Sequence, residues 1–561
     1  MEDLRAGPLV RAVSPDGITI WTEWKQPCEV TLSAAPADVA GDAQPHVVVA
    51  RTVTIGSRYY ALCVLTALRP ATWYTYHLGC ADKPGEPATW LETTLLQCFR
   101  TLDLPDAGQP LRLAYGSCRR LTAPGPDALS AFGGWLRDRY AERETLWPRV
   151  LLLIGDQIYA DDPAQRSQAR SFAEFALLYV KAWAGDEGVR QVLAALASLM
   201  IFDDHEITNN WNITPLWQAQ RLRQGGAQML IDGLVAYWVY QGWGNFGLQD
   251  AADHDLLAIM RQAEESGLDA LAALQERIRQ AIYRVKTLKW DYTLPTMPPI
   301  FVFDARADRS VAPDQQSAAD IAPRIIGKEQ MARLYAWAGA YEESTLVLVS
   351  SVPALLPPAI GLAEYMLGLR PLRPMAFAPL RRLVRFVSSR QHGVSARMGF
   401  EHWPVFYATW RELVAFCAQR KRDLFILSGD VHFSYAMAAH VPGSPPSKRA
   451  VLYQLVTSPF RNELGPPERR LILAQSGLKQ LIYGGLHMRT LALAREKETE
   501  PAPFGLLLQN VIALVTYLPQ AEEKGVYEVE HVYMGVVERK LVKVGATNFP
   551  APRSARHQES T

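Results

Sequence analysis

Short runs of β-branched and aromatic residues, each closed by Pro, Gly or Asp, repeat through the first hundred residues of the chain. Runs of this length and composition are typical of strands that turn back on one another. We therefore predict an all-β domain over residues 1–103, followed by a linker at 103–110, where Pro, Gly and Asp cluster. The runs that carry the prediction are 17–24, 46–55, 58–68 and 72–80.

A different pattern begins at residue 111, where almost continuously apolar runs alternate with segments of helical periodicity. Strands buried on both faces and separated by helices describe an α/β domain whose sheets are covered by helices. We assign this domain to residues 104–545, with a helical insertion at about 217–290 and a polar tail at 546–561. The apolar runs are 111–118, 149–156, 197–204, 299–306, 345–351 and 423–430, and strand-like segments return at 451–458 and 526–544.

Composition restricts the classes of function. Of 561 residues, 49% are hydrophobic and 20% are charged, and 58 basic against 57 acidic residues leave a net charge of +1. A balanced charge provides no field that attracts nucleic acid or an anionic membrane, so neither is expected as a main partner. The two longest apolar candidates for a membrane span, 346–369 and 504–519, contain Pro or amide side chains and are interpreted as core segments.

Cysteine usage and the N-terminus bear on the compartment. Six cysteines are too few for a disulfide scaffold, although a bridge among Cys28, Cys63, Cys80 and Cys98 stays open. The N-terminus lacks a basic stretch followed by an apolar one, which is the pattern of a secretory signal. We expect a cytoplasmic protein, or a secreted or periplasmic one if its start has been trimmed. Nothing in the sequence determines the oligomeric state, and a monomer is the default expectation.

Four of the apolar runs end on residue types that bind metals. The carboxyl ends of strands form the crevice in which α/β proteins bind ligands. Acidic, thiol and imidazole side chains that meet there repel one another unless a cation is bound. The four ends are LAYGSC with Cys118, GDQIY with Asp156 and Tyr159, IFDDHE with Asp204 and His205, and LSGDVH with Asp430 and His432.

Each of these motifs has a purely structural interpretation when it is taken alone. A single cysteine is more often a small buried hydrophobic residue, and DDHE fits an acidic helix start. The GDQIY motif fits a capped turn with a tyrosine in the core. Their joint occurrence, each after an apolar strand, favours a metal site.

The order GDxxY, DHE and GDxH resembles the motif series of the metallophosphoesterase superfamily. The thiol in GSC, together with FDARADR (303–309), IGKEQMARLYAW (326–337) and YQLVTSPFRN (453–462), is similar to the alkaline phosphatase D family. The resemblance covers nearly the whole chain and implies a four-layer sandwich of two mixed β-sheets flanked by helices. Members of the family often carry an N-terminal β-sandwich, and here 68–78 with 98–102 resembles the last strands of a fibronectin-type module.

Carried over residue by residue, the resemblance implies two metals bridged by the carboxylate of Asp156. Cys118, Tyr159 and His432 would complete the first position. A thiolate and a phenolate are soft or redox-tolerant donors that suit ferric iron, and family members are described as using iron and calcium. The first position is therefore expected to bind Fe³⁺.

The second position would take its donors from carboxylates alone. Asp204 stands where the superfamily has the Asn of GNHE, and Asp430 stands where it has the first His of GHxH. With Asp156 they form an all-oxygen set, which suits a hard cation. We expect Ca²⁺ there, with Mg²⁺ or Mn²⁺ as alternatives.

The resemblance also implies a reaction. Two such metals clamp a phosphoryl group and activate a shared water, whose hydroxide attacks phosphorus in line with the leaving oxygen. His205 is placed to protonate the leaving oxygen, with support of the metal ligands as its alternative role. Asn209 or Asn210 is expected to bind a phosphate oxygen. Gln157 and Arg119 adjoin ligands and are further candidate substrate contacts.

Several charged residues near these motifs have two interpretations. Arg306 and Arg309 are suited to a bidentate phosphate contact, but an ion pair with an aspartate of their own segment explains them equally well. Asp161 and Asp162 are expected in a solvated turn, with a third cation site as the alternative. Glu206 is interpreted as a cap or as an acceptor behind the ligands.

The sequence thus predicts a metal-dependent phosphoesterase that hydrolyses small phosphate monoesters, diesters or both, in the manner of alkaline phosphatase D. A phospholipase D-like or nuclease-like diesterase is the alternative, and the width of the pocket, which the insertion at 217–290 is expected to set, decides between them. The balanced charge argues against long polyanionic substrates. A non-catalytic metal-binding scaffold is disfavoured because every expected ligand position is filled.

Overall fold

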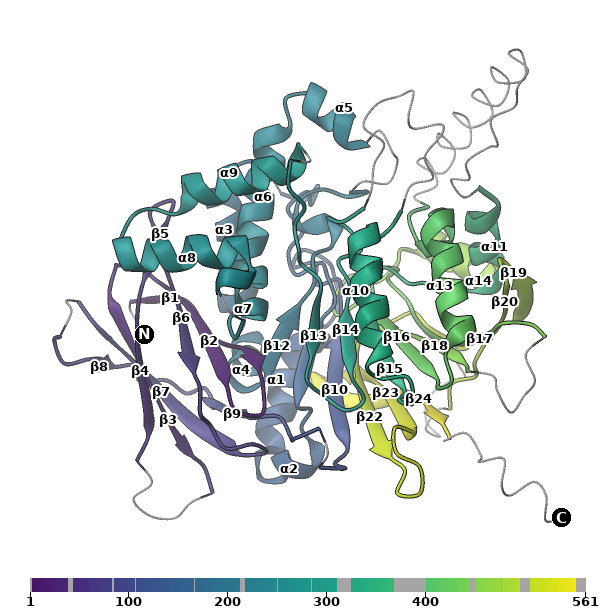
Figure 1. The fold of residues 1–561 in the computed structure, drawn as a ribbon, viewed down its shortest axis with the longest axis horizontal. Helices are drawn as coiled ribbons and strands as arrows, with labels where there is room; N and C mark the ends of the chain where they lie inside the picture. Colours follow the sequence, from purple (N-terminus) through teal and green to yellow (C-terminus); the bar gives the residue numbers. More distant parts are fainter. Residues whose placement is uncertain are drawn as a thin grey trace.

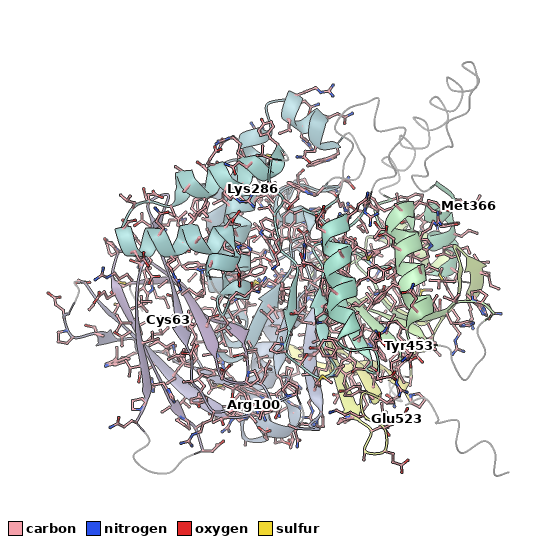
Figure 2. All side chains as sticks on the ribbon, viewed as in Figure 1. Cys63, Arg100, Lys286, Met366, Tyr453 and Glu523 are labelled. Carbon is pink, nitrogen blue, oxygen red and sulfur yellow. The ribbon has the colours of Figure 1, made fainter. Side chains whose placement is uncertain are left out.

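The molecule, a computed structural model, consists of an all-β domain packed beside a larger α/β domain (Figure 1). Within the described residues four sheets form, two in each domain. Side chains fill the space between the layers (Figure 2). The structure describes residues 3–38, 44–82, 85–105, 107–165, 167–211, 217–249, 251–283, 285–309, 324–367, 400–443, 450–475, 477–494 and 505–550.

Two antiparallel sheets form the N-terminal domain, which confirms the prediction of an all-β fold there. In β3, and over most of β6, buried and less buried side chains alternate, because successive residues of a strand point to opposite faces. One sheet has the order β1 (Leu4–Val13), β2 (Ile18–Trp24), β6 (Arg58–Leu65) and β5 (Val53–Ile55). The other has the order β4 (His46–Arg51), β3 (Glu29–Pro36), β7 (Trp73–Ala81) and β8 (Thr89–Trp90), with β9 (Cys98–Arg100) paired to β7.

Strands β1 and β3 were not predicted, and their composition explains why. Gly7 and Pro8 interrupt the apolar run of β1, and small residues dilute that of β3. The cysteines left open as bridge partners are free thiols. In the described part of the chain no helix combines the length and the apolar character needed to cross a bilayer.

The first sheet of the α/β domain is mixed. β10, β11 and β12 are parallel neighbours, and the late strands β22, β23 and β24 extend the sheet in antiparallel fashion. The order is β12 (Ala197–Met200), β11 (Val150–Leu153), β10 (Leu111–Gly116), β22 (Val511–Pro519), β23 (Tyr527–Val537) and β24 (Lys540–Phe549). β24 therefore runs into the segment 546–561 expected to be a polar tail, whose residues 551–561 lie outside the described part.

The second sheet is also mixed, which confirms the expected fold class. β14, β15, β16 and β18 are parallel neighbours, and the remaining neighbouring pairs in the sheet are antiparallel. The order is β13 (Tyr292–Leu294), β14 (Ile300–Val302), β15 (Leu346–Ser350), β16 (Leu424–Ser428), β18 (Leu452–Val456), β17 (Ser434–His440), β20 (Leu486–Thr490) and β19 (Gln480–Tyr483), with β21 (Leu506–Leu507) beside β17.

Helices cover the outer faces of both sheets. Alternate residues of β15 and β16 enter two different cores: Leu348 and Ile426 pack toward α10 and α13, whereas Val349 and Leu427 pack between the sheets. The helices are α1 (Ala128–Asp138), α2 (Arg143–Leu146), α3 (Phe172–Ala184), α4 (Glu187–Ala195), α5 (Trp217–Arg223), α6 (Ala227–Tyr237), α7 (Trp243–Phe246), α8 (Asp255–Ser266), α9 (Leu271–Ile282), α10 (Lys328–Gly339), α11 (Pro358–Leu367), α13 (Tyr407–Gln419) and α14 (Pro466–Gln475).

The stretch predicted as a helical insertion contains α5 to α9. A π-helical turn, Trp238–Gly242, joins α6 to α7 without a break. In Figure 1, α6, α8 and α9 lie above the N-terminal domain, and α7 contacts both β1 and β2. The insertion therefore packs against the N-terminal sheet as well as against its own domain.

Candidate metal centre and active site

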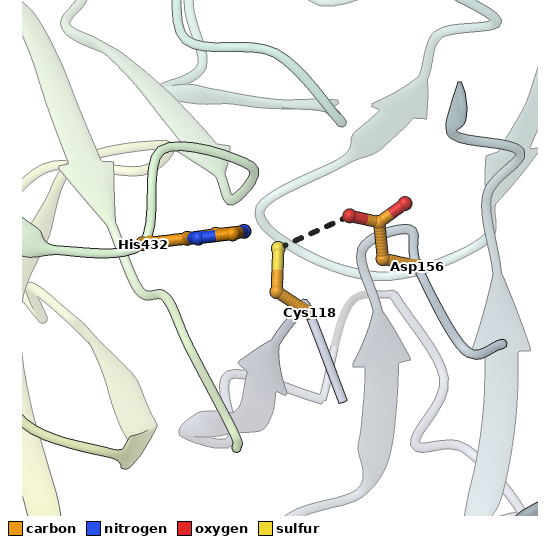
Figure 3. A group of neighbouring side chains, drawn as sticks. All are labelled: Cys118, Asp156 and His432. Carbon is orange, nitrogen blue, oxygen red and sulfur yellow. Dashed lines mark hydrogen bonds between the residues drawn. The ribbon is translucent and has the colours of Figure 1, made fainter. Parts of the chain in front are cut away.

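The side chains predicted to bind metals come together between the two sheets of the α/β domain. The loops after β10, β11 and β12 leave the same edge of one sheet because these strands are parallel neighbours, and the loop after β16 enters from the other sheet. Figure 3 shows Cys118, Asp156 and His432 pointing toward one another. The predicted ligands that meet here are Cys118, Asp156, Tyr159, Asp204, Asp430 and His432.

Asp156 belongs to every group of possible metal donors in the described part of the chain. Within each group, one donor atom per residue lies within 4.8 Å of all the others. A carboxylate shared in this way suits two cations held side by side. The groups are Cys118 with Asp156 and His432; Asp156 with Asp204 and His205; and Asp156 with Asp203, Asp204 and Asp430.

Tyr159 lies at the edge of the first group. Its hydroxyl donates to Asp156 Oδ2 at 3.2 Å and lies 3.5 Å from His432 Nε2. The Asn462 amide donates to the Tyr159 hydroxyl at 3.0 Å and lies 3.2 Å from His432 Nε2. Sequence reasoning missed Asn462: it ends the motif YQLVTSPFRN, but the motif alone gives no reason to choose this residue.

Four of the predicted ligands hold a backbone conformation that is uncommon outside glycine. The φ angles are 58° at Cys118, 55° at Asp156, 68° at Asp430 and 59° at His432. Residues in the left-handed region carry strain that the surrounding structure must support, and they cluster at functional sites. Gly429 lets the loops from the two sheets meet, because a Cβ there would lie 2.2 Å from Ser117 Oγ.

Burial acts against the charged forms of these donors. Burial, reinforced by neighbouring carboxylates, raises the pKa of Asp156 well above its usual range. The thiol of Cys118 and the phenol of Tyr159 have raised pKa values, again chiefly because they are buried. Burial lowers the pKa of His432 to about 4, which keeps its imidazole neutral and able to bind a metal. Because a bound cation favours ionised carboxylate, thiolate and phenolate, this donor set fits cations.

Arg306 is a fully buried cation behind the carboxylate group. Its guanidinium pairs with Asp203 and Glu401. It also donates to Asp430 Oδ1 at 3.3 Å and lies 3.6 Å from Asp204 Oδ1. The sequence left open a phosphate contact or an ion pair within its own segment, and the structure shows ion pairs with acids of other segments instead.

The carboxylate of Asp430 has a second buried partner that sequence reasoning missed. His402 Nε2 lies 3.1 Å from Asp430 Oδ2, and His402 Nδ1 lies 2.9 Å from Glu364 Oε1. Burial opposes a charge on His402, but Glu364 and Asp430 raise its pKa to about 10. No motif marks these residues, because they belong to different segments and meet only in the fold.

A cavity of about 390 Å³ opens beside the metal-binding groups, and His205 lines it. The imidazole stacks on the Tyr159 ring with the ring centroids 4.3 Å apart, and its Nδ1 lies 2.8 Å from Asp161 Oδ1. This contact leaves Nε2 as the nitrogen that can meet a substrate. Burial disfavours the charged ring, but Asp204, Asp156 and Asp161 together raise the pKa of His205 well above its ordinary value.

The candidate substrate contacts separate into two groups. Asn209 lines the cavity, and the backbone N–H of Asn210 donates to Asp204 Oδ2 at 2.6 Å. Gln157 is buried and turns its amide to the Gly155 carbonyl. The prediction for Arg119 fits the structure poorly, because its buried guanidinium binds Asp127 at 2.7 Å and the Ala182 carbonyl at 2.6 Å.

The neighbouring Arg120 lines the cavity in place of Arg119. Its guanidinium donates to Asp162 Oδ1 at 2.5 Å, and Asp162 also accepts from Thr122 and from the Ala164 amide. The expectation of a solvated turn was therefore wrong for Asp162, which is buried, whereas Asp161 is half-buried in the turn and its carboxylate contacts His205. The RR pair in GSCRR was the signal for Arg120, but consecutive residues point in different directions and sequence does not say which one enters the cavity.

Two mixed sheets covered by helices, with carboxylate, thiol and imidazole donors gathered at the strand ends, define a metallophosphoesterase-type protein. The profile of the PhoD-like phosphatase family matches residues 114–481, and the chain belongs to this family. Residues 1–92 match a domain of unknown function (DUF7800). No curated protein matches the sequence.

The fold is similar to that of a solved structure described as the structure of PhoD. The TM-score is 0.55 at 13% identity, and the match covers 97% of this chain and 92% of that chain. A second match is the sensor domain of the anti-sigma factor RsgI4 of Pseudobacteroides cellulosolvens, at 14% identity and a TM-score of 0.13. It covers 18% of this chain and 95% of that chain, and carries no argument about the fold or the site.

Proposed function

We propose that the protein is a metal-dependent hydrolase of small phosphate esters, acting on monoesters, diesters or both. The observation that carries the proposal is the sharing of Asp156 between groups of buried donors beside the cavity that His205 lines. The membership of the chain in the PhoD-like phosphatase family supports the reaction class. Bound cations would neutralise phosphate oxygens and act as Lewis acids toward the attacking water.

The donor chemistry supports a different cation at each position. Cys118, Tyr159 and His432 with Asp156 would hold Fe³⁺, because thiolate and phenolate suit a ferric ion. The carboxylates of Asp156, Asp204 and Asp430 would hold Ca²⁺, or Mg²⁺ or Mn²⁺, because all their donors are oxygens.

In the proposed reaction His205 supplies a proton to the leaving oxygen. Asp161 engages Nδ1 and fixes the ring against Tyr159, so that Nε2 carries the proton toward the cavity. The raised pKa of His205 is consistent with a ring that holds this proton before the ester bond breaks. As the bond breaks, the proton moves from Nε2 to the departing alkoxide.

The phosphate group would be held by Arg120 and Asn209, which line the cavity. Asp162 fixes the Arg120 guanidinium through a 2.5 Å contact, so little side-chain freedom is lost when an anion binds. A cavity of about 390 Å³ has the size of a small-molecule site. The acidic residues Asp161, Glu463 and Glu468 at the same cavity disfavour a long polyanion.

The proposal is tested with full-length protein and two chromogenic esters, p-nitrophenyl phosphate and bis(p-nitrophenyl) phosphate. We expect hydrolysis that EDTA abolishes and added metal restores, and elemental analysis of protein purified without added metal should find iron. Asp156→Asn should remove the activity because it removes the shared carboxylate, whereas Asp138→Asn, at an exposed position of α1, should not. Hydrolysis of neither ester by protein that contains metal would overturn the proposal and favour a binding protein.

A further inference from the structure

A buried arginine of the N-terminal domain, Arg11, contacts the segment behind the metal site. Arg11 lies on β1, which packs against β12 of the first α/β sheet, and its side chain is fully buried. Its guanidinium donates to the carbonyls of Tyr240 at 3.0 Å and Gln241 at 2.6 Å, and to Asn245 Oδ1 at 2.9 Å. None of these acceptors is a carboxylate, so the cation is held by oriented amide dipoles.

The acceptors of Arg11 lie in and just after the π-helical turn Trp238–Gly242. A π-turn replaces i→i+4 hydrogen bonds by longer-range ones and is frequent at functional sites. Gly244 leaves the space that Arg11 needs, because a Cβ at this position would lie 2.6 Å from Arg11 Nε.

Two side chains of the turn, Tyr240 and Gln241, form hydrogen bonds to different parts of the molecule. The Tyr240 hydroxyl donates to Glu23 of the N-terminal domain at 2.7 Å. The Gln241 amide instead donates to Glu206 Oε1 at 3.0 Å, and also to the Tyr179 hydroxyl at 3.0 Å. The turn therefore touches the N-terminal domain on one side and the metal-binding loops on the other.

Glu206 binds the backbone of two of the three loops that carry metal-binding aspartates, those after β11 and β12. Its Oε1 accepts a hydrogen bond from the backbone N–H of Gln157 at 2.7 Å. Its Oε2 accepts from the backbone N–H groups of Asp156 at 3.2 Å and Asp203 at 2.9 Å. One buried carboxylate thus sets the separation of the loop after β11 from the loop after β12. Gln241 is the side chain that fixes this carboxylate from behind.

We propose that the N-terminal domain positions the metal-binding carboxylates through a continuous path from Arg11 to the π-turn, Gln241 and Glu206. Arg11 holds the carbonyls of the turn, the turn holds Gln241, and Gln241 holds the carboxylate that spaces the two loops. Arg11 and Gln241 are positioning residues, since neither touches the donor atoms. The path gives the domain of unknown function a role within this chain.

The inference rests on the proposed metal site, and its test is metal retention. We would purify the full-length protein and the variants Arg11→Met, Arg11→Lys and Gln241→Met, and follow the loss of iron and calcium during dialysis against EDTA. Residues behind metal ligands affect metal affinity by about ten- to a hundredfold, so we expect Arg11→Met and Gln241→Met to lose metal about tenfold faster than the parent protein. Arg11→Lys keeps the charge and should recover part of the retention.

Arg100→Met is the matched control. Arg100 is a buried arginine of the same domain, labelled in Figure 2, and it contacts the α/β domain through Glu144 at 3.2 Å. Its partners Asp103 and Glu144 do not belong to the path. Arg100→Met should lower thermal stability and leave metal retention unchanged.

The double variant distinguishes an effect that passes from Arg11 through Gln241 from two effects on metal retention that arise independently. If Arg11 acts through Gln241, Arg11→Met with Gln241→Met should lose metal about as fast as Gln241→Met alone. Metal retention in both single variants equal to that of Arg100→Met would overturn the inference, as would multiplicative effects in the double variant. A parent protein that binds no metal and hydrolyses no ester would instead overturn the proposed function.

Discussion

Removal of Arg306 should make folding of the protein depend on a bound cation. This side chain is fully buried and pairs with Asp203, Glu401 and Asp430. Asp204 lies 3.6 Å from the same guanidinium. Arg306 is therefore the charge that balances several buried carboxylates when no metal is bound.

The expected magnitude follows from this geometry. Breaking a buried ion pair by removal of one partner costs about 3–5 kcal/mol, because the remaining charge is left uncompensated. Arg306→Met should lower the free energy of unfolding in EDTA by about 4 kcal/mol. A cation bound to the same carboxylates supplies the missing charge and binds only the folded protein, so added calcium should recover more stability in the variant than in the parent protein.

Urea denaturation, followed by tryptophan fluorescence in EDTA and in calcium, measures both quantities. Arg420→Met is the control: Arg420 is also buried, and its guanidinium donates to the backbone carbonyls of Tyr341 at 2.7 Å and Ser344 at 2.9 Å rather than to the metal-binding carboxylates. Its loss should lower stability equally in EDTA and in calcium. An Arg306→Met variant whose destabilisation does not change with calcium would refute the assignment of Arg306 as the counter-charge.

Three further predictions concern the cavity and the core. His205→Ala should lower kcat about a hundredfold while the metal content stays unchanged. The loss should be smaller with p-nitrophenyl esters than with alkyl esters, because an alkoxide leaving group needs the proton more. Equal losses with both ester types would exclude the acid role of His205. Arg120→Gln should raise KM about tenfold and leave kcat nearly unchanged, and the reverse split would show that Arg120 does not anchor the substrate. Burial lowers the pKa of His531 to about 3. Between about pH 6.5 and pH 3 this histidine is therefore protonated in the unfolded chain but not in the folded one, so the free energy of unfolding decreases as the pH is lowered. Urea titrations should show that lowering the pH from 7 to 5 decreases the free energy of unfolding by about 2 kcal/mol through this group. His531→Gln should make the decrease smaller, whereas His77→Gln, at an exposed position, should leave it unchanged.

Most of the ligand positions follow from local sequence because each sits at the end of an apolar strand. A strand buried on both faces must be continuously apolar, so a carboxylate or thiol directly after it marks the carboxyl edge of the sheet. Asp156 and Asp430 were found in this way, and the structure brings their carboxylates into one donor group. The roles of these residues remain predictions that the experiments above test.

Local sequence failed where the direction of one side chain matters. Arg119 and Arg120 are adjacent and chemically identical, but Arg119 binds Asp127 and only Arg120 enters the cavity. Asp162 looked like a turn residue because nothing near it in the sequence shows that Arg120 and Thr122 come from another loop to bury it.

The sequence by itself determined the class of the fold and the donor types at the strand ends, because hydrophobic periodicity and strand-end residues are local properties. Only the tertiary structure decided which distant groups surround those donors. Arg306, His402 and Asn462 reach the site from three separate segments, and Arg11 reaches the turn behind it from another domain. Partners of a buried charge are selected by proximity in the fold, and that proximity depends on the packing of the whole chain.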